Sequence, residues 1–439
     1  MALTLRRTIP FVLALATVLV ATPAAAVDEP APDAPATALR VALDRALGEH
    51  AFLLGEVIRS GIAGAADFNA AAGALEQNSD DVIGAITDVY GVDAGEAFGA
   101  QWRNHVAYIV DYGRALDEDD EAAAQLATEQ LDRYVTDFSG FLADALPALP
   151  PDAIEGLIGE HVQQLEHVAS FDMDDFGGAY GAIRETYTHM FAVGDGLTIG
   201  IVTLFPDRFT GRDRAFSPAT DLRVTLDRLL GEHSYLAALA MRAVLRGATD
   251  VPSAVDALSA NSEELRATMA EIYGAGAGDA FHVLWSTHVD AYVAYVTALA
   301  DDDASAADVA LDELGAYQAE FSSFVADANP FLSREALQML IAEHTDQLVA
   351  QADAYAAGDF EASYQLGREA YAHVGELGAS LARAISDQFP MRIPDTAGSR
   401  PRAPIGIFGI VLLGAALIPV VRAIGDRSRV SAEVRASDG

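Results

Sequence analysis

Hydrophobic residues recur every three to four positions along most of the chain, and no run with a two-residue period is long enough to predict a strand. This spacing predicts amphipathic helices, each with one apolar face, and therefore an all-α protein. Glycine, proline or clustered aspartate interrupts the pattern where helices are expected to end. In the first part of the chain the predicted helices are 38–61, 65–90, 93–117, 120–145, 151–170 and 174–202.

The same pattern occurs twice. The Leu-Gly-Glu-His sequence that ends at His50 recurs at His233, an offset of 183 residues (233 minus 50), and one inserted residue later raises the offset to 184. Short connections favour antiparallel packing of consecutive helices. We therefore predict two tandem six-helix bundle-like repeats, 38–209 and 221–393, with a short polar joint at 210–220. Because each repeat has a complete set of helices, each is expected to fold alone.

Both ends of the chain carry patterns that are typical of targeting signals. Residues 1–26 combine two arginines, an apolar run and an Ala-rich cleavage site, which predicts a signal peptide, and 27–37 is a Pro- and Ala-rich linker expected to be disordered. Near the other end, the apolar segment 403–422 is long enough for a transmembrane helix, between a stalk (394–402) and a cytoplasmic tail (423–439). The expected location is the cell membrane, with a single pass, the repeats outside and the membrane as partner.

A second interpretation concerns the segment just before the apolar stretch. Residues 393–397 read Ile-Pro-Asp-Thr-Ala, which resembles a cell-wall sorting signal followed by an apolar stretch and basic residues. The chain would then be joined to the cell wall instead of remaining anchored in the membrane. The pattern leaves both interpretations open, although the plain anchor fits the sequence better.

The acidic composition narrows the classes of function. The formal net charge is −38 and the pI is about 4.3, which argues against nucleic-acid binding because a phosphate backbone requires a positive surface. The chain has no cysteine, so disulfides, thiolate nucleophiles and cysteine-ligated metals are excluded. No protein partner can be named from the sequence.

Histidines are the strongest candidates for chemistry. The chain has ten, and eight of them form four matched pairs between the repeats. One histidine lies on the apolar face of the first, third, fifth and sixth helix of each repeat, where facing helices of a bundle build metal sites. The eight are His50, His105, His161 and His189 in the first repeat, and His233, His288, His344 and His373 in the second.

Three interpretations of these histidines remain open. They could converge on a metal, with copper, zinc or iron as candidates because imidazole binds all three. They could be separate core residues, each hydrogen-bonded to a neighbour, or a pH-sensitive polar cluster without metal. In the metal interpretation, nearby glutamates would add a ligand or orient a ring. The candidate supporting residues are Glu49, Glu160, Glu185, Glu232, Glu343 and Glu369.

Established bundle and enzyme motifs are missing from the sequence. No histidine has a glutamate three residues before it, as a ferritin-like di-iron site requires, and there is no His-Glu-x-x-His or Gly-x-Ser-x-Gly motif. The repeated Leu-Gly-Glu-His, Trp-x-x-His and Arg-Glu-x-Tyr-x-His motifs resemble those of exported prokaryotic helical-repeat proteins of unassigned function. Some of those proteins carry a module named after copper amine oxidases. This chain lacks the Asn-Tyr-Asp/Glu motif of the quinone cofactor, so the resemblance implies no oxidase activity and no catalytic residue.

Taken together, these features predict a membrane-anchored, extracytoplasmic helical-bundle protein with one histidine-lined metal site in each repeat. The first alternative is a structural or partner-binding ectodomain without metal. The second is a metal-dependent oxidoreductase. Because no catalytic motif is present, binding is favoured over catalysis, and no catalytic residue is assigned.

Overall fold

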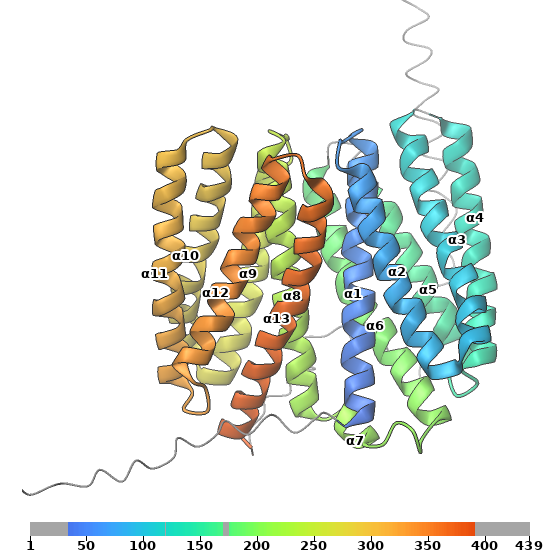
Figure 1. Cartoon of the computed structure of the whole chain (residues 1–439). Helices are drawn as coiled ribbons and strands as arrows, with labels where there is room; N and C mark the ends of the chain where they lie inside the picture. The colour runs from blue at the N-terminus through green and yellow to red at the C-terminus, as the bar shows by residue number, and fades with distance from the viewer. Residues whose placement is uncertain (1–33, 119, 170–174, 391–439) are drawn as a thin grey trace, which may run out of the picture.

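The computed structural model describes residues 34–118, 120–169 and 175–390. Within these ranges the chain forms thirteen helices and no strand, which confirms the all-α prediction. Figure 1 shows the long helices side by side with nearly parallel axes. The predicted signal peptide, the stalk, the apolar segment 403–422, the tail and most of the N-terminal linker lie outside the described residues.

The first half of the fold contains six long helices. Their bounds are α1 Pro35–Ile62, α2 Phe68–Tyr90, α3 Val92–Asp117, α4 Glu121–Ala145, α5 Pro151–Val168 and α6 Phe176–Leu204. The breaks follow local chemistry: Gly91 separates α2 from α3 with φ of 93°, a conformation that suits glycine. The Asp120 carboxylate caps α4 by accepting a hydrogen bond from the backbone N–H of Ala123 at 3.0 Å.

The second half repeats this arrangement after the short helix α7. Its bounds are α7 Arg212–Ala215, α8 Pro218–Leu245, α9 Val251–Tyr273, α10 Ala275–Ala300, α11 Ala304–Ala328, α12 Arg334–Ala356 and α13 Phe360–Gln388. The same devices recur: Gly274 has φ of 94°, and Asp303 caps α11. The proposed limits of the two repeats remain predictions, and the end of the second, at residue 393, lies outside the described residues.

The two halves pack together about an approximate two-fold axis. In the middle of Figure 1, α1, α2 and α6 of the first half contact α8, α13 and α9 of the second. The Tyr187 hydroxyl donates to the Arg228 carbonyl at 3.0 Å, and its counterpart Tyr371 donates to the Arg45 carbonyl at the same distance. The two hydroxyls lie 3.5 Å apart. One continuous apolar core therefore runs through both halves instead of two separate ones.

A group of buried charges also crosses this interface. Glu56 of α1 accepts hydrogen bonds from Arg59 at 2.9 Å, from Arg242 of α8 at 2.8 Å and from the Tyr364 hydroxyl at 2.7 Å. Burial alone would raise the pKa of Glu56, but the two arginines beside it hold its pKa well below the usual range. The carboxylate is therefore charged and binds both halves together.

The expected membrane anchor needs correction. Among the described residues, no helix combines the length and the apolar character that crossing a bilayer requires. Even the more apolar helices carry charged side chains along their length, such as Asp195 in α6 and Asp279 in α10. The segment 403–422, on which the prediction rested, lies outside the described residues. The single-pass membrane location and the membrane partner are accordingly withdrawn.

Candidate metal centres

Three histidines converge in the core of each half. His50 comes from α1, His105 from α3 and His161 from α5, and in each helix the ring lies on the apolar face. In α3, for example, Phe98, Trp102 and His105 are spaced by four and three residues, so all three side chains point to the same side. The second half builds the same triad from α8, α10 and α12 with His233, His288 and His344.

The ring nitrogens are close enough to share one ion. In each triad, one nitrogen from every histidine lies within 4.8 Å of the other two. The Nε2 atoms of His50 and His105 are 3.0 Å apart, and those of His233 and His288 are 3.2 Å apart. Nitrogens bound to a tetrahedral metal at about 2.0–2.1 Å are separated by roughly 3.3 Å. The triad spacing therefore suits a metal ion with little rearrangement.

Burial keeps the triad histidines neutral. His50, His105 and His161 are 0%, 1% and 5% exposed. Burial lowers the pKa of His105 and His288 to about 4 and that of His344 to about 3. Burial, and then the neighbouring histidines, also hold the pKa of His50, His161 and His233 well below 6.5. At neutral pH these rings are therefore unprotonated, which is the form that binds metal.

Several triad nitrogens are buried without a hydrogen-bond partner. Among the described residues, neither ring nitrogen of His161 has one, and the Nδ1 atoms of His233 and His344 have none. Most buried polar atoms in folded proteins are paired, because an unpaired one costs about 1–3 kcal/mol. The orphaned nitrogens argue against the interpretation that each histidine is a separately satisfied core residue. An ion on the converging nitrogens would pair one of the two orphans of His161, whereas binding through Nε2 leaves the Nδ1 atom of His233 without a partner.

Aromatic rings enclose each triad. Trp102 packs against His50 and His105 with ring centroids 4.5 and 4.8 Å away, and Tyr134 of α4 stacks on His105 at 5.0 Å. Trp285 and Tyr317 take the same places in the second half. Sequence reasoning did not assign these four residues to the site. The available signal was that both pairs recur at the 183-residue offset.

A small apolar cavity adjoins the first triad, and a second cavity lies in the core of the other half, beside Trp285 but lined by no triad histidine. In the first half it measures about 30 Å³ and its lining includes His105, His161 and Met190. In the second half it measures about 60 Å³ and its lining includes Trp285 and Met269. A space of this size holds a water molecule or a ligand of similar size, but not an organic substrate.

The fourth histidine of each predicted set lies outside the triad. His189 of α6 shares a hydrogen bond of 2.8 Å with the Leu157 carbonyl through Nε2, and its Nδ1 lies 3.7 Å from Glu160. His373 of α13 repeats both contacts with Leu340 and Glu343. These two histidines therefore tie α6 to α5 and α13 to α12, and they are satisfied without a metal.

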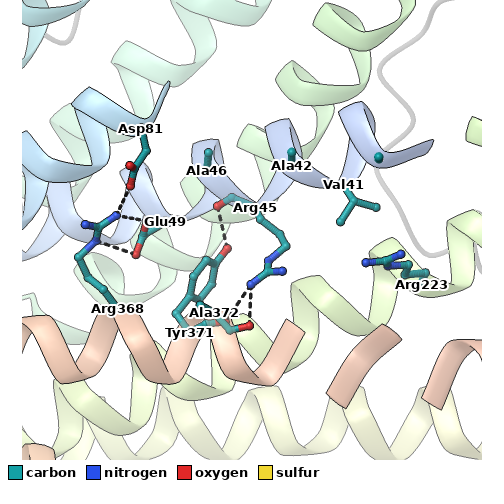
Figure 2. A pocket seen from close by; sticks show the side chains of 11 residues that line it. Val41, Ala42, Arg45, Ala46, Glu49, Asp81, Arg223, Arg368, Tyr371 and Ala372 are labelled. Atoms are coloured by element: carbon teal, nitrogen blue, oxygen red, sulfur yellow. Dashed lines mark hydrogen bonds and ion pairs between the residues drawn. The ribbon is translucent and has the colours of Figure 1, made fainter. Parts of the chain in front are cut away.

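The glutamates considered as supporting ligands have other surroundings. Glu160 and Glu343 have 60% of their side chains exposed, and Glu185 and Glu369 are also exposed. Glu49 and Glu232 are buried, but each pairs across the interface between the halves. Glu49 accepts hydrogen bonds from Arg368 (Figure 2), Asn78 and Tyr235, and Glu232 accepts them from Arg184 and Asn261.

Comparisons with known proteins add no relative. No family model matches this chain, and neither the curated proteins nor the solved structures include a match. The resemblance to exported helical-repeat proteins therefore stays a prediction.

Proposed function

We propose that this protein is a metal-binding helical bundle in which each half holds one ion on three imidazoles. The ligands are His50, His105 and His161 in the first half, and the matching triad in the second. The observation that carries the proposal is the convergence of three buried ring nitrogens within 4.8 Å, repeated in both halves. Because the cavity that adjoins the first triad is only about 30 Å³, the proposed role is binding of the ion rather than conversion of an organic substrate.

Copper in its monovalent state is the proposed ion. Imidazole suits copper, zinc and iron alike, so the ligand type alone does not choose between them. The surroundings of the triads favour an ion of low charge. The triads are neutral and are enclosed by aromatic and aliphatic side chains, and the glutamates considered as supporting ligands lie elsewhere. The cost of burying an ion rises with the square of its charge, so a monovalent ion costs about a quarter as much as a divalent one.

Metal stoichiometry tests the proposal directly. The full chain is loaded anaerobically with Cu(I) and, in parallel, with Zn(II), and bound metal is measured after removal of the free ion. We expect two copper ions per chain, one in each of the single variants His105→Gln and His288→Gln, and none in the double variant. X-ray absorption of the copper form should show three nitrogen ligands at about 2.0 Å.

A histidine outside the triads provides the control. His282 belongs to no triad and pairs with Glu263 at 3.2 Å, so His282→Gln should keep two ions. Circular dichroism of each variant verifies that the helices remain folded. If copper binding survives in the folded double variant, or if the wild-type chain binds no metal at micromolar concentration, the triads are not metal sites. Tighter zinc than copper binding would overturn the choice of ion alone.

A further inference from the structure

The two core cavities differ in whether they reach a triad. In the first half the lining includes His105 and His161 together with Trp102. In the second half it includes Trp285, the counterpart of Trp102, but no triad histidine. Most of the other lining positions of the first cavity recur in the second at the 183- or 184-residue offset. The two cavities are therefore equivalent spaces, and only the first is bordered by the proposed metal ligands.

Two lining positions have a smaller side chain in the first half. Val82 of α2 and Val193 of α6 are matched in the second half by Leu265 and Leu377, and all four side chains are buried. Each leucine carries one methylene group more than valine. A cavity of about 30 Å³ is taken up by roughly one or two such groups. The two valines therefore account for space beside the first triad.

Three imidazoles leave one position of a tetrahedral ion unfilled. Protein sites with three ligands typically hold a water molecule or a substrate in the fourth position. The fourth histidine does not take it, because Nε2 of His189 shares its hydrogen bond with the Leu157 carbonyl at 2.8 Å. Among the described residues, no carboxylate oxygen joins the three ring nitrogens either. An ion on this triad therefore keeps a coordination position for a molecule from outside.

One side chain of the lining is a competing ligand for that position. Met190 lines the first cavity, and its counterpart in the second half is Val374. A thioether is a soft ligand that binds Cu(I). A sulfur atom bound to the copper would leave no free position, so the two arrangements give different first coordination shells and can be told apart by experiment.

The size and the lining of the first cavity select a small neutral molecule. A water molecule needs about 10–15 Å³ of such space, so a cavity of about 30 Å³ has room for roughly two heavy atoms. Most of the lining is aliphatic or aromatic, and the Trp102 N–H already donates to Ser79 at 3.3 Å. A buried water would lack the two to four polar partners that it usually has. Apolar cavities also take up xenon, so entry of a small neutral molecule requires no permanent channel.

We propose that the first triad, when it holds copper, binds a neutral diatomic gas, the class to which carbon monoxide and dioxygen belong. The second triad binds such a molecule much more weakly, because no cavity borders its histidines. This inference rests on the proposed function, since the copper ion supplies the coordination position. The two halves then share a metal site but differ in what the metal can bind.

Carbon monoxide is the probe, because it binds Cu(I) without changing the oxidation state of the metal. The full chain is loaded anaerobically with Cu(I), and bound copper and the infrared band of bound carbon monoxide are measured on the same sample. We expect two copper ions and one carbon monoxide per chain. His288→Gln, which keeps only the first site, should bind one carbon monoxide per copper. His105→Gln, which keeps only the second, should bind it at least tenfold more weakly.

Exchange of the cavity residues tests the origin of this difference. Val82→Leu combined with Val193→Leu gives the first half the side chains of the second. In the His288→Gln chain this change should leave copper binding intact and weaken carbon monoxide binding by tenfold or more. Val135→Leu is the control, because it adds the same group on α4 outside the cavity lining and should change neither. Circular dichroism verifies that each variant is folded.

The reciprocal exchange, Leu265→Val with Leu377→Val in the His105→Gln chain, should strengthen carbon monoxide binding at the second site by at least tenfold. Copper without carbon monoxide in the wild type would refute this inference alone, whereas absence of copper would refute the proposed function with it. The inference is also wrong if both wild-type sites bind carbon monoxide equally. Unchanged binding in the folded Val82→Leu/Val193→Leu chain, or a sulfur ligand from Met190 in the X-ray absorption spectrum of the first site, would overturn it as well.

Discussion

The histidine triads and the interface between the halves differ in how closely the two halves match. Ring centroids are 5.2, 6.1 and 6.4 Å apart in the first triad and 5.1, 5.8 and 6.4 Å apart in the second. At the interface, by contrast, Glu56 is matched by Leu239 and Phe52 by Tyr235. The interface is symmetric in part, because Tyr187 is matched by Tyr371 and Glu49 by Glu232. It differs where one residue near the axis serves both halves, as Glu56 does, whereas the triads match at all three positions.

The largest expected effect comes from separating the halves. The buried interface leads us to revise the expectation that each repeat folds alone. Residues 38–209 alone would expose Phe52, Tyr187 and the charged Glu56, all of which the second half now covers. We expect either isolated half to melt without a cooperative transition, and an equimolar mixture of 38–209 and 221–393 to recover one. A cooperative melt of a monomeric half, followed by circular dichroism, would restore the original expectation.

A smaller effect is expected from making the interface symmetric. Glu56→Leu gives the first half the residue that the second half has at the matching position, and it removes the carboxylate shared by Arg59 and Arg242. Because two buried guanidinium groups then lose this carboxylate, and only Arg59 keeps another partner in Asp67 at 3.2 Å, urea unfolding should show a loss of about 3–5 kcal/mol. Leu239→Met is the control and should cost less than about 1.5 kcal/mol. An equally stable Glu56→Leu chain would mean that the buried charges contribute nothing to joining the halves.

The smallest expected effect is the difference between the two triads. His50→Gln leaves only the second site intact and His233→Gln only the first. Because the two triads have nearly the same geometry, their copper dissociation constants should agree within about tenfold, or 1.4 kcal/mol. Competition with a chromophoric Cu(I) chelator measures both constants under the same conditions. A hundredfold difference would show that surroundings outside the triads, such as the cavities of different size, control the affinity.

Sequence reasoning found most of the fold because the relevant signals are local. Gly91 and Pro151 mark helix boundaries through backbone geometry, and the observed ends of the first six helices lie within about three residues of the predicted ones. Periodicity also identified the apolar face that carries each histidine. Periodicity shows which face of a helix is buried. It does not show how far along the helix axis a histidine lies relative to the histidines of the neighbouring helices. For this reason three histidines converge, while His189 reaches the Leu157 carbonyl instead.

Contacts between the halves could not be predicted in the same way. The Glu49 carboxylate was considered as metal support, yet it binds Arg368, which is 319 residues away along the chain. The Glu56 carboxylate likewise binds Arg242, which is 186 residues away. Neither has a periodic signal within one repeat. Such features become visible only when the two halves are placed in contact.

The single carboxylate of Glu56 has a consequence for how this gene can vary. In a homodimer of one repeat, every mutation would appear twice around the axis, so one acidic side chain between two arginines could not arise. Fusion of the two copies into one reading frame removes that constraint, because a codon on one side of the axis can change alone. Glu56 in one half and Leu239 at the matching position of the other is an arrangement that only a fused chain can encode.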